Sequence, residues 1–297
     1  MNAASRARLS AGNGWGLVEF LIAIALGLLL TLLASGLLIA TASNYRNHSD
    51  NAWLADGGRY ALQTMAQAIR QGAYINWDSD VAPPELDPDT PAAVDGRDAA
   101  SISRSSDGIG AVLPPVANGS DVLALRFAGS GAGASGDGSS VNCAGFGVAG
   151  AAQGWSIFYV AADAGGEPEL RCKYRSASGW GADAVVRGVD SFQVLYGVDT
   201  DMPLDGVPNT YLNATAVQAM AAWKRVCSIK LALLLHGERN TRSDTVDARY
   251  DLFGPAYADA HGEDVGVRVA EGSLPPSQRL RARRLFSMTV ALRNRDG

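Results

Sequence analysis

The sequence predicts an α+β protein in which a long N-terminal, membrane-spanning helix precedes an antiparallel β-sheet domain with long loops. Residues 20–40 form an apolar run without a single charge, and several later segments have the β-branched, aromatic or alternating patterns of strands. The composition of the 297 residues, 47% hydrophobic and 19% charged, is typical of a chain that folds. The net charge of -5 argues against a general nucleic-acid-binding protein, which needs a basic surface.

The apolar run has the length of a membrane span. A helix rises about 1.5 Å per residue, so residues 20–40 would reach across the ~30 Å hydrocarbon core of a bilayer. A cleaved secretory signal is a weaker interpretation, although Ala40-Thr41-Ala42 offers a cleavage site, because signal peptides have apolar regions of about 7–15 residues. A plain signal anchor accounts for the length, but it leaves Glu19 only as a tolerated acid near one end of the span.

The helix is expected to continue beyond the membrane. Residues 43–71 contain no proline, and Gly72 is suited to end a helix as its C-cap. The following apolar and aromatic residues recur near helical spacing: Tyr45, Trp53, Tyr60, Leu62, Met65 and Ile69. We therefore predict one helix from Trp15 to about Arg70, with an apolar half over 15–42 and an amphipathic half over 43–72 that packs on the domain.

The remaining chain, 73–297, is expected to form one β-rich domain. Residues 78–120 are rich in proline and read as loops. A short helix is expected over 214–223. Strands are predicted over 121–128, 155–161, 169–175, 191–198, 225–236 and 284–293.

Residues Gly14 to Phe20, with the sequence GWGLVEF, resemble the type IV prepilin motif. That motif consists of a short basic leader, a glycine, an aromatic residue, a glutamate at the fifth mature position and an apolar helix. The resemblance implies that residues 1–14 are a leader removed by prepilin peptidase between Gly14 and Trp15, after which Trp15 is usually N-methylated. It also implies that Glu19 serves assembly by pairing with the N-terminal amine of a neighbouring subunit. Trp15 and Gly16 depart from the commoner Phe and Thr.

Later segments resemble the PilW family of minor pilins. The resemblance rests on residues 188–199 (GVDSFQVLYGVD), on Trp223 before the strand at 226–235, and on a terminal strand that ends at Arg295. It implies the pilin architecture, a long helix carrying a globular domain like a lollipop, and a minor pilin that primes assembly and sits at or near the tip of a pilus used for twitching, attachment or DNA uptake. The implied partners are other minor pilins, the major pilin, a tip adhesin, prepilin peptidase and the inner-membrane assembly platform.

The resemblance also implies a location in the bacterial inner membrane with a periplasmic domain, and at the pilus surface after assembly. One alternative is a minor pseudopilin of a type II secretion system, similar to the J component. Another is a single-span anchored binding or enzyme domain. No catalytic constellation is evident, because the three histidines show no metal-ligand spacing and no nucleophile elbow is present; we expect no enzyme.

Cys143 and Cys172 flank a predicted strand pair in the extracytoplasmic part, where disulfides persist. A bridge between them would close a loop of about 30 residues and stabilise the domain by about 3–4 kcal/mol in the chain-entropy model. The alternative is two buried thiols. Cys227 lies in an apolar strand and reads as a core residue, although it could pair with either of the other two.

Asp199, Asp201, Asp205 and the adjacent Gly206 resemble a degraded EF-hand-type loop. Calcium sites need several carboxylate oxygens at alternating positions, but Pro203 occupies the fifth position here and no glutamate stands at the twelfth. We therefore favour an acidic β-turn, with calcium as the alternative. No other cofactor is expected.

Two further patterns are interpreted as structural. Residues 131–136 match G-x-G-x-x-G, but the residues that follow break helices, so we expect a loop and no dinucleotide site. Arg279, Arg281, Arg283 and Arg284 form a basic run that we interpret as a solvated strand edge, which charge protects from aggregation. Binding to DNA or to an acidic partner is the alternative.

Overall fold

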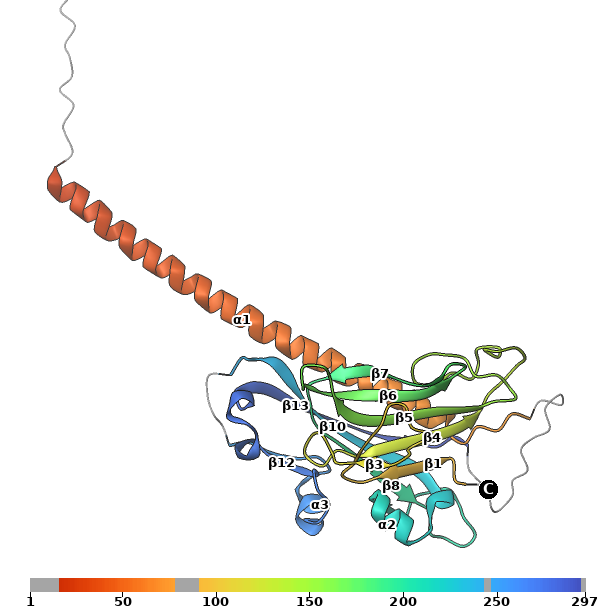
Figure 1. The fold of residues 1–297 in the computed structure, drawn as a ribbon. Helices are drawn as coiled ribbons and strands as arrows, with labels where there is room; N and C mark the ends of the chain where they lie inside the picture. Colours follow the sequence, from red (N-terminus) through yellow and green to blue (C-terminus); the bar gives the residue numbers. More distant parts are fainter. Residues whose placement is uncertain (1–15, 78–90, 243–246, 295–297) are drawn as a thin grey trace, which may run out of the picture. The chain divides into compact units, whose positions relative to one another are not determined.

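One long helix, α1 (Leu17–Gln71), opens the described part of the computed structural model, which comprises residues 16–77, 91–242 and 247–294 (Figure 1). Glu19 in its first turn and Arg70 in its last complement the helix dipole. The helix ends where predicted, but the residue that takes the left-handed conformation is Ala73 (φ 57°) and not Gly72. The amide of Ala73 donates to the carbonyl of Arg126 at 2.9 Å, which offsets the conformational cost.

The chain divides into two compact units, Met1–Ser49 and Asp50–Gly297. The second unit begins inside α1, because helix residues between Leu54 and Ile69 are buried in the core of the β-rich domain. The predicted leader, 1–14, lies outside the described residues.

The first sheet of the domain is antiparallel, with five strands in the order β1-β4-β5-β6-β7. Their bounds are β1 (Val94–Arg97), β4 (Val122–Ala128), β5 (Gln153–Ala162), β6 (Pro168–Ser176) and β7 (Gly179–Arg187). Strand β7 is an edge strand, and its pairing with β6 shifts register between Leu170 and Arg171.

The second sheet has four antiparallel strands in the order β13-β10-β8-β9. Their bounds are β8 (Val189–Val198), β9 (Thr210–Leu212), β10 (Val226–Asn240) and β13 (Arg281–Ala291). Two short ladders join β2 (Ser101–Ile102) to β3 (Val112–Leu113) and β11 (Arg249–Asp251) to β12 (Arg268–Ala270). The predicted α+β class, with a long helix and antiparallel sheets, is confirmed.

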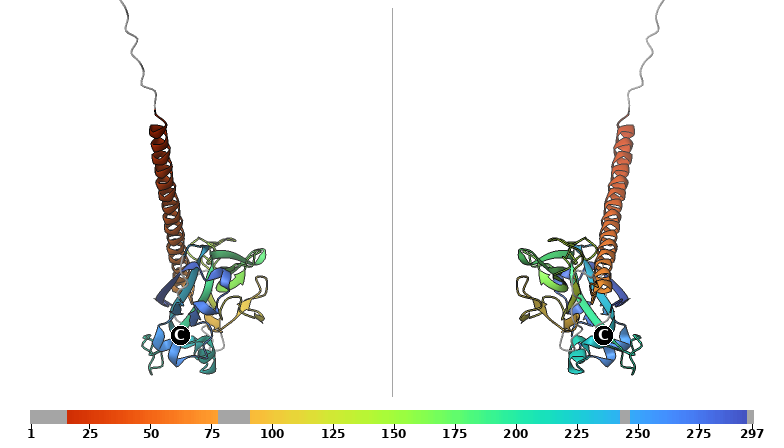
Figure 2. Two further views of the ribbon diagram at one scale, coloured as in Figure 1. Left: turned by 90° about the vertical axis from the view of Figure 1, so that its left-hand side faces the viewer. Right: turned by 90° about the vertical axis from the view of Figure 1, so that its right-hand side faces the viewer.

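Short helical segments complete the domain. They are α2 (Ala214–Ala219), α3 (Pro255–Ala260) and three 3-10 turns over Trp223–Arg225, Glu271–Ser273 and Pro276–Gln278. Helices α2 and α3 lie at the same end of the domain, as the two side views in Figure 2 also show. The predicted helix over 214–223 therefore exists but is shorter, since Ala221 takes a positive φ of 47°.

The core explains why β10 is apolar along most of its length. Leu231, Leu233 and Leu235 face the main core, which also contains the buried face of α1. Ala232 and Leu234 point the other way, into a smaller core with Leu252, Val269 and Leu274. Because successive side chains of a strand alternate between its two faces, a strand covered on both sides is apolar throughout.

Candidate functional site

The N-terminal half of α1 presents an apolar surface that the described residues leave uncovered. Its large apolar side chains, between Leu17 and Ile39, are 44–78% exposed. Within the described residues, α1 is the one helix that is long and apolar enough to cross a membrane; the mean hydropathy of its best window is 2.6. Such a surface is suited to lipid or to the apolar helices of other subunits.

Glu19 is the single charged residue in this half of α1 before Arg46, and it occupies the third helical position. Its Oε2 accepts a hydrogen bond of 2.9 Å from the backbone N–H of Gly16. This is the backward contact of a capping box, in which a glutamate satisfies an amide that the helix leaves unpaired. Gly16 has no side chain to make the forward contact. Gly14 and Trp15, the predicted processing site, lie outside the described residues.

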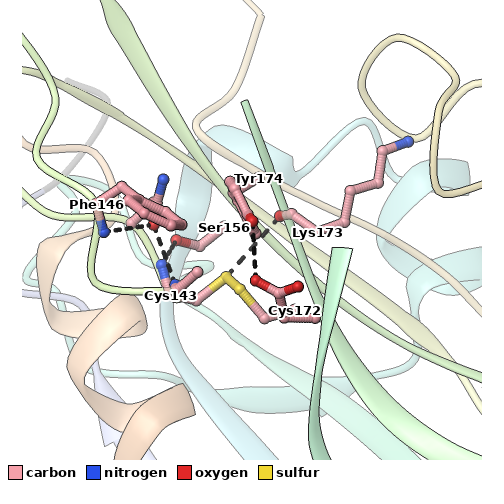
Figure 3. Close-up of a disulfide and its surroundings, with 9 residues drawn as sticks. Cys143, Phe146, Ser156, Cys172, Lys173 and Tyr174 are labelled. Atoms are coloured by element: carbon pink, nitrogen blue, oxygen red, sulfur yellow. Dashed lines mark hydrogen bonds between the residues drawn. A yellow bond between two sulfur atoms is a disulfide. The ribbon is translucent and has the colours of Figure 1, made fainter. Parts of the chain in front are cut away.

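A disulfide joins Cys143, in the loop before β5, to Cys172 on β6 (Figure 3). The two Cα atoms are 6.0 Å apart, as in ordinary disulfides. The amide of Cys143 donates to Ser156 Oγ at 3.0 Å, and the rings of Phe146 and Tyr174 lie 5.2 Å apart beside the bridge. The bridge thus fastens a glycine-rich loop to β6, the strand next to the edge strand β7.

Cys227, the third cysteine, is buried on β10 and lies outside the disulfide. Its Sγ donates to the carbonyl of Gly197 at 3.5 Å. The thiol therefore belongs to the core, as predicted.

The acidic segment between β8 and β9 is an irregular loop in which backbone amides donate to the aspartates. Asp199 is buried, and its carboxylate accepts hydrogen bonds from the amides of Asp201 at 3.1 Å and Gly206 at 2.5 Å. Asp205 accepts from the amide of Val207 at 2.8 Å. One carboxylate oxygen from each aspartate lies within 4.8 Å of the others. Backbone amides thus account for the placement of Asp199, and calcium binding stays the alternative to a purely structural role.

The arginine run corrects one interpretation from sequence. Arg283 is not a solvated edge residue, because its side chain is fully buried. Its Nε donates to Asp190 Oδ2 at 2.7 Å and its Nη1 to Glu271 Oε1 at 3.2 Å. Two buried carboxylates therefore balance this guanidinium. Only Arg284 fits the predicted exposed edge, with its guanidinium 5.5 Å from the ring centre of Phe286.

His236, at the end of the apolar part of β10, joins the same network. Its Nδ1 lies 2.9 Å from Asp190 Oδ1, and its Nε2 lies 2.5 Å from Glu167 Oε1 and 2.7 Å from Arg281 Nη1. Burial alone would raise the pKa of Glu167, but the hydrogen bonds and charges of His236 and Arg281 outweigh it and lower that pKa. Three arginines of the network, Arg242, Arg281 and Arg283, pair with its three carboxylates, Glu167, Asp190 and Glu271. The network fastens β8, β10 and β13 together, which favours a structural role.

Lys173 on β6 is a second buried charge that sequence analysis missed. Its ammonium donates to Ser103 O at 2.9 Å, to Ser106 Oγ at 3.0 Å and to Gly108 O at 2.6 Å. Burial lowers the pKa of Lys173 to about 8, with Asp107 acting in the opposite direction. The side chain holds the loop between β2 and β3 against the sheet.

A protein family and a solved structure resemble parts of this chain. Residues 157–294, from β5 to the end of the described chain, match the family of type IV pilus-assembly protein W. The structure is similar to that of the type IV-like pilin TTHA1219 from Thermus thermophilus, with 14% identity, coverage of 82% of this chain and 98% of that pilin, and a TM-score of 0.43. No curated protein matches the chain. The predicted resemblance is therefore confirmed: over residues 157–294 this chain has the sequence pattern of the PilW family of type IV pilus-assembly proteins.

Proposed function

We propose that this protein is a minor pilin that primes the assembly of a type IV pilus and sits at or near its tip. The strongest support is that two features of pilins occur together in this chain. Residues 157–294 match a pilus-assembly family, and the same chain begins with an exposed apolar helix that carries a glutamate five residues after Gly14. The role is structural and involves no catalysis.

In this proposal, α1 first anchors the protein in the inner membrane, with the domain in the periplasm. Prepilin peptidase then cuts between Gly14 and Trp15 and creates a new amine on Trp15. The apolar halves of neighbouring α1 helices pack together as the assembly platform adds subunits. A carboxylate removed from water needs a partner of opposite charge. Glu19 therefore exchanges the amide of Gly16 for the amine of a neighbour, which neutralises both charges.

Processing is tested by sequencing the N-terminus of protein extracted from membranes. We expect the mature chain to begin at Trp15. A chain that begins at Met1 would indicate an uncleaved anchor, and one that begins at Ser43 would indicate a secreted domain. Either result contradicts the proposed function.

The pairing is tested by Glu19→Ala, with Leu28→Ala as the control because Leu28 is an exposed apolar residue of the same helix. We expect Glu19→Ala to be processed normally but to enter sheared pili at least about tenfold less. The substitution leaves the amine of the neighbouring subunit unpaired, and each 1.4 kcal/mol of binding free energy lost lowers the equilibrium constant for incorporation about tenfold. Leu28→Ala loses apolar surface but no charged partner, so it should enter clearly better than Glu19→Ala. Equal amounts of wild type and Glu19→Ala in sheared pili would count against the pairing. Protein absent from pili but needed for secretion would favour the J-like pseudopilin.

A further inference from the structure

A recess of about 360 Å³ lies within the domain, beside the second half of α1. It is lined by α1, by the edge strand β7 and by the loop of residues 141–145, and both cysteines of the disulfide are among its lining residues. We name this recess the α1–β7 groove. Its main lining residues are Tyr60, Thr64, Gln71, Asn142, Asp183 and Val185.

Two amide groups that line the α1–β7 groove are buried donors without acceptors. Asn142 is 4% exposed, and its Oδ1 accepts the amides of Ala144 at 3.0 Å and Phe146 at 3.1 Å. These two bonds fix which end of the amide is oxygen, so Nδ2 is the unused donor. Among the described residues neither Asn142 Nδ2 nor Gln71 Nε2 has a hydrogen-bond partner, although both atoms are buried. Buried donors are almost always paired in native proteins, so each of the two needs an acceptor that the described residues do not supply, either a water or a group of another chain.

The charge of the groove indicates which acceptors fit. Asp183 is its only lining carboxylate and already accepts the hydroxyl of Tyr174 at 2.8 Å, and none of the lining residues is basic. An anionic ligand would meet no cation there. The unused donors therefore suit neutral acceptors, of which the peptide carbonyl is the commonest.

The length of the groove points to an extended chain. Its helical wall runs from Tyr60 to Gln71, about 16 Å at 1.5 Å per residue. An extended peptide advances about 3.3 Å per residue, so about five residues would fill that length. Tyr60, 60% exposed, adds an aromatic surface. Val185 lies at the register shift of β7, on the outer strand of the sheet.

We propose that the α1–β7 groove binds an extended, uncharged segment of another pilus subunit, whose peptide carbonyls accept hydrogen bonds from Gln71 and Asn142. The inference rests on the proposed function only for the identity of the partner. The site is separate from Glu19, because all of its residues belong to the β-rich unit.

The test places the photo-crosslinker p-benzoylphenylalanine at Gln67, an exposed residue of the groove wall, in the full chain in its own cells. Arg59, exposed on the same helix but outside the groove, is the control position. After irradiation, mass spectrometry identifies the linked peptide. We expect position 67 to link to one short segment of another pilus subunit at least tenfold more than position 59.

Two substitutions then test the hydrogen bonds. Gln71→Leu removes one donor, and Asn142→Asp removes the other while keeping the acceptor that Ala144 and Phe146 use. We expect each to reduce the link from position 67 about tenfold, with an unchanged or higher Tm for the detergent-solubilised full chain. Retained Tm separates lost binding from misfolding. A lower Tm together with a lost link would overturn this assignment of the two donors.

The inference is overturned if the crosslinker at position 67 yields no link, or links only to lipid or to a protein outside the pilus. It is also overturned if Gln71→Leu and Asn142→Asp leave the amount of linked product unchanged. An immunoblot of sheared pili from the same cells separates this inference from the proposed function. Protein present in pili without a link at position 67 overturns the groove alone. A link to a pilus subunit with no protein in pili contradicts the proposed tip location alone.

Discussion

The two halves of α1 share one helical backbone but differ in what covers their side chains. Between Leu54 and Ile69 the apolar residues are buried in the domain core, whereas between Leu17 and Ile39 they are exposed. The first half is the more apolar of the two, so its exposure does not follow from polarity. The difference teaches that the cover of the second half is encoded in this chain, while the described residues leave the first half exposed, as a surface suited to lipid or to other apolar helices.

Asp50 in the second half and Glu19 in the first show the same division. Asp50 is buried in the β-rich unit, where its Oδ2 lies 3.3 Å from the hydroxyl of Thr241 and its carboxylate packs against Gly237. A Cβ at position 237 would lie 2.0 Å from that oxygen, so the glycine leaves room for Asp50. Glu19 has the amide of Gly16, which a partner can replace.

The largest expected effect on stability comes from shortening a buried side chain in the second half of α1. Met65 is fully buried between α1 and the sheets. We expect Met65→Ala to lower the free energy of unfolding by about 3 kcal/mol, because it removes buried surface and leaves a cavity. Denaturant unfolding of the full chain in detergent, followed by tryptophan fluorescence, measures this change.

Leu32→Ala is the matched control, since Leu32 is 72% exposed in the first half. We expect it to change unfolding of the domain by less than about 0.5 kcal/mol. Similar losses in both variants would erase the contrast between the halves and indicate that the first half also packs within the chain.

The contrast also separates what sequence reasoning can predict from what it cannot. The helix and the central strands β8 and β10 were predictable, because their patterns are local and strongly apolar. Strand β7 was missed because it is rich in glycine and alanine and has only one buried residue, Val186. The burial of Arg283 was missed because its partner Asp190 lies 93 residues away, and no local pattern reveals such a pair.

The site divides in the same way. Glu19 could be singled out from its neighbours in sequence, since the leader, the glycine and the apolar helix surround it. The α1–β7 groove could not, because Gln71, Asn142 and Asp183 come from three distant segments that only the fold brings together.

A smaller effect is expected at the glycines of α1. At Gly58 a Cβ would lie 2.4 Å from the ring of Phe286, whereas at Gly36 it would meet nothing within 4 Å. We expect Gly58→Ala to destabilise the domain by about 1–3 kcal/mol through overpacking. Gly36→Ala should leave unfolding of the domain unchanged, although alanine favours the helix itself by up to about 1 kcal/mol. The same unfolding assay compares them, and a stabilising Gly58→Ala would refute the close packing of Phe286.

The smallest expected effect is on the pH dependence of stability and comes from Lys173. Its buried ammonium has all three of its hydrogen-bond acceptors within the domain, whereas Glu19 is expected to pair with another subunit. Because burial lowers the pKa of Lys173 to about 8, the folded protein releases this proton at lower pH than the unfolded chain, whose lysine titrates near 10.5. Between those values the unfolded state binds more protons, so stability should rise with pH, by about 1–2 kcal/mol from pH 8 to 9.5.

The measurement is the free energy of unfolding of the wild type and of Lys173→Met across that pH range. Lys173→Met should be less stable at every pH, because Ser103 and Gly108 lose a hydrogen-bond donor. Its curve should also lack the rise. Tyrosines with raised pKa values titrate mainly above this window and are common to both proteins. Their contribution therefore cancels when the two unfolding free energies are subtracted. If the curves of unfolding free energy against pH are parallel for wild type and Lys173→Met, Lys173 keeps its proton in this pH range. The three oxygens around its ammonium would then stabilise the charge as fully as water does.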